Sequence, residues 1–451
     1  MVDNKKTKLT RREFMTGTAS MAGVLILSAC KPAATAVPTQ APAPTKAKPQ
    51  ITVWECSTYV PEADEIQDNQ IREWCDKHNV DLTLERMPPE EWTTKWKIAF
   101  ETKQFPDMGR IFEQDLPKFI LAGDLLEVTD ITKRLNELEG GFSEGTWLAS
   151  QGADGKQYAL PMWTGVGYFY ARKDKVEEKG LAFPDTWDDV LKAAKAITVP
   201  GEFWGWGSVV SASTDGQDSL TAKLWAYGAA PWSADGKPAI DSPETRQVLD
   251  LMREAWEAGV IPPDAPTWDS AGNNKAYQNG TVGMVHNTGS IANYLKKEDT
   301  ELLSKTQVGV IPSGPKGRFT PGYYYVRGIL KTTKYPEVCR ELSEWLSKPE
   351  QLRPMYEAGA GFMLPSYLGM IEDETWQDPY LKPLVENLRY TYPIGYPGPT
   401  TPWALDEYSD MTMAKMLPRM MVEGWDNDRI IAEANDELQK WYDEWQKKLN
   451  A

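Results

Sequence analysis

Between residues 51 and 85 the hydrophobic period of the sequence changes twice, and the order of these changes points to one kind of unit. Residues 51–54 form a short run with strand propensity, residues 61–78 carry an apolar stripe at helical spacing, and residues 80–85 alternate apolar with polar side chains. A strand, a helix and a strand over so short a length form a βαβ unit, with parallel strands and a right-handed crossover. The sequence therefore predicts an α/β fold.

Further helices are predicted where capping residues precede an apolar stripe. Thr186–Asp189 has the pattern of a capping box, in which the Thr hydroxyl and the Asp carboxylate each accept a backbone N–H. Ser242 followed by Pro243 predicts another helix start. A last helix is predicted from about residue 426. We interpret the apolar stripes of these helices as core.

The N-terminus resembles an export signal. Thr10–Met15 contains a twin-arginine motif, and the apolar run that follows is shorter than the ~20 residues that span a bilayer. The run ends in Leu27–Cys30, which resembles a lipobox, where the cysteine is lipidated and becomes the new N-terminus. We expect residues 1–29 to be a twin-arginine-type lipoprotein signal peptide and Cys30 to be lipidated. The alternative is an apolar N-terminal helix with a chance pair of arginines.

A tether is expected after Cys30. Residues 30–49 are rich in Pro, Ala and Thr and contain almost no large apolar side chain, so this segment cannot bury a core. The folded domain is then residues 50–451, about 400 residues, which is enough for two lobes. We expect the domain at the extracytoplasmic face of the membrane, in the periplasm or on the cell surface.

The charge of the chain argues against nucleic acid as a partner. The formal net charge is −16, and removal of residues 1–29, with five basic and two acidic side chains, makes it −19. Nucleic-acid phosphates require a basic surface. No second apolar segment is long enough to cross a membrane.

The cysteines and histidines give no metal or nucleophile motif. Cys56 and Cys75 could form one disulfide, which an exported compartment permits, or remain two buried thiols, and Cys339 is expected in the core. The two histidines, His78 and His286, are far apart in sequence, and no Cys or His cluster has metal-ligand spacing. Nucleotide-binding glycine motifs are also absent from the sequence. We therefore expect no metal and no cofactor.

A dispersed set of motifs runs in order through the mature chain. The most specific is Asp154–Pro161, which is followed by Tyr168–Asp174. Together the motifs resemble the extracellular solute-binding proteins of ABC importers, in the carbohydrate-binding branch related to maltose-binding protein. Phe105 stands where this family commonly has glycine, and Arg172 where asparagine is common. The other matching segments are Phe105–Met108, Gly123–Leu126, Phe183–Asp188, Tyr277–Met284 and Val308–Gly317.

The resemblance implies two α/β lobes with a ligand cleft and a hinge between them, a periplasmic-binding-protein-like fold. One lobe would comprise about residues 50–163 and 323–368, and the other about residues 166–318 and 372–451. Pro321–Gly322 and Gly359–Gly361 are candidate hinge regions, since glycine tolerates large changes of φ, although ordinary turns are the alternative.

The function that the resemblance implies is binding without catalysis. The protein would bind a carbohydrate as a monomer, close its lobes on it and deliver it to the permease subunits of an ABC transporter. Pyranose rings present apolar faces to aromatic side chains and hydroxyls to polar ones. The aromatic candidates for this role are Tyr59, Trp163, Trp204, Trp206, Tyr323, Tyr324, Trp403 and Tyr408, and the polar ones are Glu113, Gln114, Asp115, Thr164, Asp215, Gln217, Asn287, Ser290 and Arg327.

Other functions remain open at this stage. Glu113 and Asp115 could serve as the paired carboxylates of an exported carbohydrate-active enzyme. A ligand-presenting subunit of a sensor would share the fold and the cleft. For each aromatic candidate core packing is the alternative role, and for each polar candidate it is a solvated loop side chain. The motifs do not specify which sugar is bound, or whether the solute is a polyol instead.

Overall fold

The fold is taken from a computed structural model that describes residues 48–58 and 60–449. The predicted signal peptide, the lipidated Cys30, most of the tether and the candidate ligand residue Tyr59 lie outside the described residues. In the described part, no helix is both long enough and apolar enough to span a bilayer.

The first of two sheets contains the predicted βαβ unit. Helix α1 (Pro61–Lys77) connects two parallel neighbours, β1 and β2, as the hydrophobic periods predict. The strand order is β10-β9-β3-β1-β2, and β4 pairs with β9 as well. The six strands are β1 (Gln50–Cys56), β2 (Asp81–Met87), β3 (Met108–Phe112), β4 (Leu160–Val166), β9 (Thr320–Ile329) and β10 (Thr391–Tyr392).

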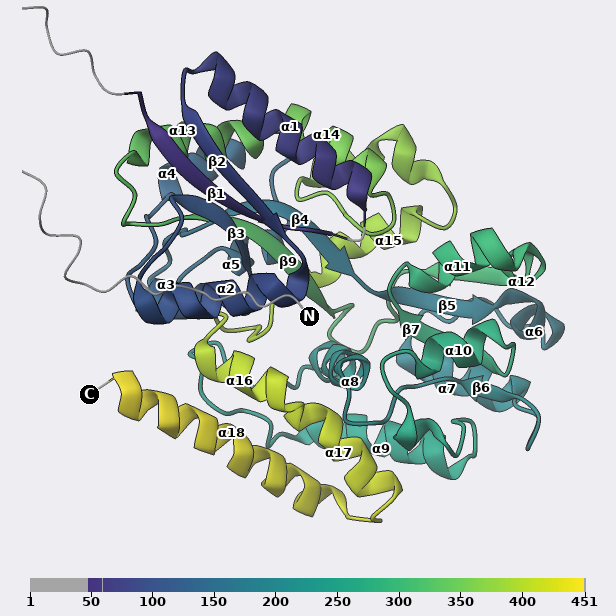
Figure 1. Cartoon of the computed structure of the whole chain (residues 1–451). Coiled ribbons are helices and arrows are strands. Elements are labelled where there is room, and N and C mark those ends of the chain that lie inside the picture. Colours follow the sequence, from purple (N-terminus) through teal and green to yellow (C-terminus); the bar gives the residue numbers. More distant parts are fainter. Residues whose placement is uncertain (1–47, 59, 450–451) are drawn as a thin grey trace, which may run out of the picture. The chain divides into compact units, whose positions relative to one another are not determined.

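Alternation along β1 divides the core of this half between the two faces of the sheet. Ile51 and Val53 belong to one apolar cluster, and Trp54 and Cys56 belong to another. Figure 1 shows α1, α13 and α14 over one face, and α2 and α3 over the other. The helices of this half are α2 (Pro89–Thr102), α3 (Leu116–Leu121), α4 (Thr129–Leu135), α5 (Glu144–Ala149), α13 (Pro336–Leu346) and α14 (Pro349–Ala358).

The second sheet has four strands in the order β6-β7-β5-β8. Along β5, Phe169 packs in the cluster shared with α7 and α9, whereas Tyr168 and Tyr170 pack toward α10, α11 and α12. The elements of this half are β5 (Tyr168–Arg172), β6 (Trp204–Trp206), β7 (Val282–Asn287), β8 (Thr306–Gly309), α6 (Lys173–Glu178), α7 (Trp187–Ile197), α8 (Thr214–Tyr227), α9 (Pro243–Glu257), the 3-10 helix η1 (Ala265–Thr267), α10 (Gly272–Gln278), α11 (Ser290–Glu298) and α12 (Thr300–Ser304).

Local capping explains where two of these helices begin, as predicted. Thr186 Oγ1 accepts the N–H of Asp189 at 3.0 Å, and the Asp189 carboxylate accepts the N–H of Thr186 at 3.2 Å, which is a complete capping box. Ser242 Oγ accepts the N–H of Thr245 at 3.1 Å, with Pro243 in the first turn of α9.

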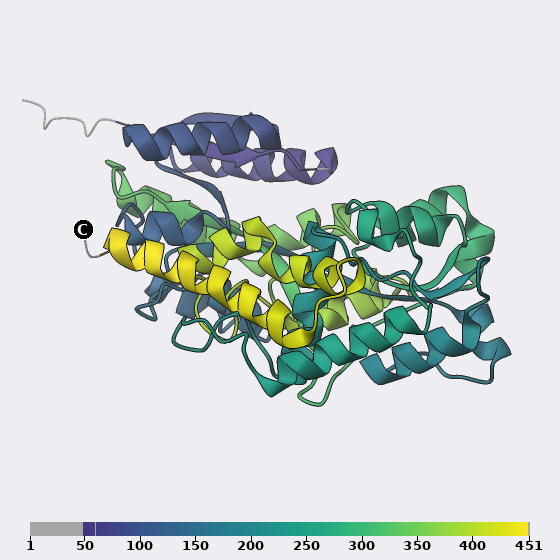
Figure 2. The same ribbon diagram turned by 90° about the horizontal axis from the view of Figure 1, so that it is seen from below.

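The C-terminal helices pack against the second half. Figure 2 shows the long helix α18 (Asn427–Leu449) lying along α16 (Pro402–Asp410) and α17 (Thr412–Met421), and α17 also packs on α8 and α9. Shorter elements precede them, namely η2 (Leu368–Glu372), η3 (Glu374–Gln377), α15 (Lys382–Glu386) and η4 (Asn387–Tyr390).

The chain passes between the sheets at several points. Gly167 separates β4 of the first sheet from β5 of the second, and residues 310–319 lead from β8 back to β9. Gly322 lies inside β9, where a Cβ would be 2.1 Å from the Thr391 side chain, so close packing explains this glycine. Strand β10 joins the first sheet, although its residues fall in the range expected for the second lobe. The lobe boundaries and the hinge remain predictions.

The three cysteines among the described residues are buried thiols. Cys56, Cys75 and Cys339 are all free, so Cys56 and Cys75 take the second of the two alternatives that the sequence left open. Burial raises the pKa of Cys75 to about 11, which keeps that sulfur protonated and unreactive at neutral pH.

Candidate functional site

A cleft of about 630 Å³ lies where the two halves meet. The first half contributes Trp163 from β4, Tyr325 from β9, and Phe362 from the segment after α14. The second half contributes Asp215 from the first turn of α8, and Ser290 and Asn293 from α11. We call the first set the aromatic wall and the second set the polar wall. The volume lies within the range of about 300–1,000 Å³ that is usual for small-molecule sites.

Strand register builds the aromatic wall. Trp163 and Tyr325 are directly opposite each other in the antiparallel β4–β9 pair, so their side chains share one face of the sheet. Their rings stack with centroids 3.4 Å apart and an interplanar angle of 17°, and Phe362 lies 5.4 Å from Trp163. The guanidinium of Arg110 lies 4.5 Å from the Tyr325 ring, a cation–π contact that fixes the pair in place.

Helix capping positions the carboxylate of the polar wall. Ser213 caps α8, so that Asp215 stands in its first turn. The Oδ2 atom of Asp215 accepts hydrogen bonds from Asn273 Nδ2 at 3.3 Å and from Asn287 Nδ2 at 3.4 Å. Burial raises the pKa of Asp215 to about 6, so this carboxylate is ionised at neutral pH. It can therefore accept further hydrogen bonds from a solute.

Deeper in the structure a second carboxylate links the two halves. Asp218 accepts a hydrogen bond from the hydroxyl of Tyr323 on β9 and another, at 2.8 Å, from the hydroxyl of Tyr408 on α16. Asp218, Tyr323 and Asn287 line a small cavity of about 30 Å³ beside the cleft, together with His286. Burial lowers the pKa of His286 to about 3, so this ring is neutral and supplies no positive charge.

The pKa of Asp218 carries a testable consequence for stability. Burial raises it from 3.8 to about 7. Between these pH values the folded state keeps a proton that the unfolded state has lost, so the free energy of unfolding falls as pH rises across this window. The loss from this group alone is up to about 4 kcal/mol. Urea denaturation at about pH 4.5 and pH 7.5 measures it.

The variant Asp218→Asn provides the comparison, because it has no carboxyl to titrate at this position. We expect the free energy of unfolding of the variant, relative to that of the unmodified protein, to rise as the pH rises. This holds even if the variant is the less stable protein at acidic pH. Carboxyls other than the neighbouring Asp215 titrate equally in both proteins and cancel in the difference. If the difference in free energy of unfolding between the two proteins is the same at both pH values, this would contradict the raised pKa of Asp218.

The predicted residues Glu113, Gln114 and Asp115 follow β3. Glu113 is buried, and its two oxygens accept the backbone N–H groups of Tyr324 at 2.9 Å and Ile394 at 3.3 Å. Burial raises the pKa of Glu113 to about 8. Glu113 and exposed Gln114 line a hollow of about 200 Å³ next to the cleft, whereas Asp115 precedes α3 and lines neither. Because Glu113 anchors two backbone segments, it is poorly placed to act with Asp115 as a catalytic pair.

The structure therefore sorts the predicted ligand residues. Trp163, Asp215, Ser290 and Tyr323 line the cleft, Asn287 lies in the small cavity, and Tyr408 holds Asp218. Of the remaining candidates, Tyr59 lies outside the described residues, and Glu113, Gln114 and Asp115 are described above. The others do not line the cleft.

Several candidates have side chains that are packed or bonded away from the cleft. Trp206 is buried and stacks with Trp187 in the core of the second half. Arg327 is buried in an ion pair with Glu55 at 2.8 Å. Gln217 is buried and donates a hydrogen bond to Glu407, and the hydroxyl of Tyr324 donates to the Thr391 carbonyl. Thr164 is buried in β4. The indole N–H of Trp403 donates to the Gly236 carbonyl, and its ring packs on Tyr442.

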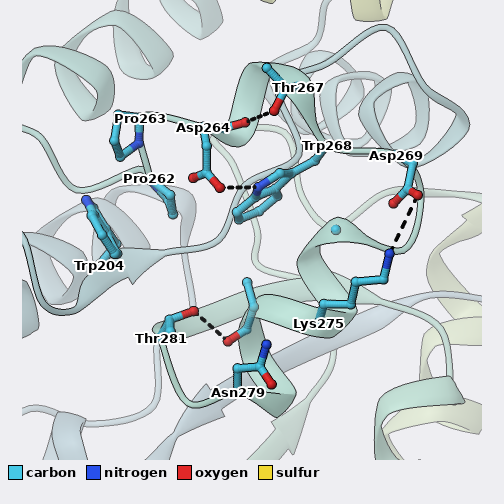
Figure 3. Close-up of a pocket in the computed structure, with 12 residues that line it drawn as sticks. Trp204, Pro262, Pro263, Asp264, Thr267, Trp268, Asp269, Lys275, Asn279 and Thr281 are labelled. Atoms are coloured by element: carbon cyan, nitrogen blue, oxygen red, sulfur yellow. Dashed lines mark hydrogen bonds and ion pairs between the residues drawn. The ribbon is translucent and has the colours of Figure 1, made fainter.

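Trp204 lies in a separate hollow on the second half, shown in Figure 3. This hollow also measures about 630 Å³, and it shares no lining residue with the cleft. Trp204 therefore does not line the cleft.

Sequence reasoning missed four residues of the site. Tyr325 and Phe362 complete the aromatic wall, Asn293 lies on the polar wall, and Asp218 organises Tyr323 and Tyr408. For Tyr325 and Asp218 the sequence did contain a signal that could have identified them. Residues 323 and 325 must share a face of a strand, and residues 215 and 218 are neighbours on a helix surface.

No three His, Cys, Asp or Glu side chains are placed to hold a metal ion within residues 48–58 and 60–449. The hollows around the site also lack cationic side chains. Among the described residues that line the cleft, the small cavity and the hollow at Glu113, none is Lys or Arg. The site thus offers aromatic faces, neutral polar groups and carboxylates.

Comparison with known proteins places this arrangement among relatives. A sequence profile described as "Bacterial extracellular solute-binding protein" matches residues 70–383, over half of the chain. The chain is 22% identical over 311 residues to YcjN of Escherichia coli, which is named as a candidate ABC transporter periplasmic-binding protein. The match covers 67% of this chain and 70% of YcjN.

Solved structures share the fold. The sugar-binding protein MalE from Xanthomonas citri has a TM-score of 0.72 and 15% identity, covering 89% of this chain and 99% of that one. Maltose-bound MalE3 of T. maritima has a TM-score of 0.64 and 20% identity, covering 86% of this chain and 99% of that one. The two-lobed architecture predicted from the motifs is thereby confirmed.

Proposed function

Because this chain belongs to the family of bacterial extracellular solute-binding proteins, we propose that it captures a neutral carbohydrate in the cleft and delivers it to an ABC permease. The observation that carries the proposal is the pairing of the aromatic wall with the polar wall across one cavity of about 630 Å³. The stacked rings of Trp163 and Tyr325 suit the apolar face of a pyranose, and Asp215, Ser290 and Asn293 suit its hydroxyls.

The family is one of binding proteins that act outside the cytoplasm, not of enzymes. The descriptions of MalE from Xanthomonas citri and of maltose-bound MalE3 name a sugar, and this supports a carbohydrate as the solute of the present chain. In our proposal the protein is a monomer that is held at the membrane by a lipid on Cys30. It binds no nucleotide itself.

Closure of the two halves is part of the proposal. The walls come from different halves, so a solute that touches both stabilises the arrangement that brings them together, and its binding shifts the population toward that state. Beside the cleft, the hydroxyl of Tyr323 on β9 donates a hydrogen bond to Asp218 on α8. In our proposal this bond forms when the two halves approach each other.

A thermal-shift screen of residues 48–451 tests the function. The ligands are mono- and oligosaccharides, polyols, amino acids and peptides. A ligand that binds only the folded state stabilises it by about 2.7 kcal/mol at a hundredfold excess over its dissociation constant. We expect a rise in Tm with one series of glycans, which are recovered intact. A rise only with peptides or amino acids would contradict the carbohydrate proposal, and turnover of the glycan would contradict binding without catalysis.

The charge of the site makes a further prediction about selectivity. Asp215 and Asp218 lie at the cleft and its inner cavity with no Lys or Arg among the described lining residues. Two like charges about 4 Å apart repel by about 4 kcal/mol at an effective dielectric constant near 20. We therefore expect a uronic acid to bind at least about a hundredfold more weakly than the matching neutral sugar. Competition titration at pH 7.5 measures the ratio, and equal affinities would show that the carboxylates do not face the solute.

A further inference from the structure

The hollow that contains Trp204 is built differently from an ordinary surface depression. Two half-buried indoles, Trp204 and Trp268, line it together with Pro262 and Pro263. Figure 3 shows polar side chains around these apolar groups, including Asp264, Lys275 and Asn279. Large aromatic side chains that stay in contact with solvent in a concave site usually mark a binding surface.

Trp268 is held in a fixed orientation. Its indole N–H donates to Asp264 Oδ2 at 3.2 Å, and its backbone carbonyl accepts the hydroxyl of Ser211 at 2.6 Å. A Cβ on Gly272 would lie 2.4 Å from the Cβ of Trp268, so only glycine allows the start of α10 to approach this closely. The indole therefore offers a surface that is ordered before any ligand arrives, which reduces the entropy lost on binding.

The opposite wall comes from the sheet and from α10. Trp204 pairs with Val282 in the parallel β6–β7 register, and its backbone N–H donates to the Thr281 carbonyl at 3.0 Å. The ion pair between Lys275 and Asp269 is long, at 3.7 Å, and its side chains are 65% and 71% exposed, so a ligand can compete for them. Asn279 is exposed at the rim of the hollow.

We propose that this hollow is a second carbohydrate site, separate from the cleft. Flat apolar surfaces surrounded by amide, ammonium and carboxylate groups match a pyranose, which has apolar faces and a rim of hydroxyls. Asp264 and Asp269 outnumber Lys275 among the charged residues of the lining, so the ligand is a neutral sugar rather than an anionic one. The volume of about 630 Å³ equals that of the cleft.

Helix α10 connects the two sites without merging them. Near its start, Asn273 contacts Asp215, and Asn274 accepts a hydrogen bond from Asn287. Gly272, Lys275 and Ala276 of the same helix line the hollow. The second site thus depends on none of the side chains that line the cleft, and it can be tested independently of the proposed function.

Calorimetric titration with maltotriose and with methyl β-D-glucopyranoside tests the proposal. The variant Trp163→Ala removes one ring of the aromatic wall and weakens the cleft, so binding that remains in this variant and depends on Trp204 reports on the hollow. We expect residual binding that Trp204→Ala, added to Trp163→Ala, weakens at least tenfold. Asn279→Ala replaces an exposed side chain without risk to the fold and should weaken it several-fold.

A matched control is Trp425→Ala. Trp425 is also half-buried on this half but is held between Arg429 and Arg419, away from both sites, so its loss should change neither titration. Complete loss of binding in Trp163→Ala, or residual binding indifferent to Trp204 and Asn279, overturns the second site. Binding that depends on Trp204 while Trp163→Ala has no effect would support the hollow and contradict the proposed cleft.

Discussion

Replacement of Trp163 by alanine is expected to weaken carbohydrate binding about a hundredfold or more. Trp163 lines the cleft and stacks on Tyr325 with ring centroids 3.4 Å apart. Truncation removes an aromatic surface and also leaves the Tyr325 ring without the partner that orients it. Buried aromatic contacts of this kind cost ~2–4 kcal/mol when they are cut back to alanine. Calorimetric titration with the sugar selected by the thermal-shift screen measures the change.

Stability must be separated from affinity in this experiment. Trp163 is only 3% exposed, and cutting a buried tryptophan back to alanine costs ~3–5 kcal/mol of stability. Titration is therefore performed below the Tm of the variant. Trp163→Phe keeps a ring against Tyr325 and should recover part of the affinity, and Trp425→Ala should leave it unchanged. A Trp163→Ala protein that is folded and binds with unchanged affinity would show that the aromatic wall is not a ligand surface.

The second large effect is expected at the buried ion pair of Arg327 and Glu55. The two side chains are 1% and 0% exposed and lie 2.8 Å apart between β9 and β1. Arg327→Met removes the guanidinium that pairs with the buried Glu55 carboxylate and leaves only Arg86 and Arg110 as positive charges near it, which destabilises the protein by ~3–5 kcal/mol. Urea denaturation measures the loss. Because Arg327 lines none of the hollows at the cleft, the affinity of the folded variant should change little.

A double substitution distinguishes the unpaired charge from lost packing. Glu55→Leu/Arg327→Met removes both charges, and replacement of a buried pair by apolar side chains is often close to neutral. We expect the double variant to be more stable than Arg327→Met alone. If it is instead less stable by the sum of the two single changes, the pair contributes nothing through its charges.

Local features of the fold were predictable because they depend on nearby residues. The βαβ unit follows from hydrophobic periods within about thirty-five residues, and the helix at Trp187 follows from the capping box of Thr186 and Asp189. The two-lobed architecture came from motifs that resemble a family and not from periodicity. Neither the local sequence patterns nor the family motifs predict which residues of the two halves contact each other.

The candidate site was harder to predict because its residues meet through distant strand pairing. Trp163 faces Tyr325 only because β4 pairs with β9 in one register, across more than 150 residues of chain. Trp204 and Trp206 lie in a strand of three residues, too short for its pattern to say which side chain faces the core. Arg327 resembled a ligand residue in sequence, but the sheet places Glu55 of β1, one strand beyond β3, beside it.

Helix geometry explains why only one of the two candidates on α8, Asp215, lines the cleft. Asp215 and Asp218, three residues apart on α8, both reach the cleft region, whereas Gln217 points elsewhere and binds Glu407. The sequence identified the loop and the helix start, but the choice of Asp215 and Gln217 ignored the spacing that a helix imposes.

A crystal structure of residues 48–451 grown with the sugar that most raises the Tm tests the central claim most directly. The account predicts density for a pyranose between the aromatic wall of Trp163 and Tyr325 and the carboxylate of Asp215, with ring hydroxyls within hydrogen-bond distance of Asp215 or Ser290. Sugar density confined to other surfaces, with the cleft occupied only by water, would contradict it.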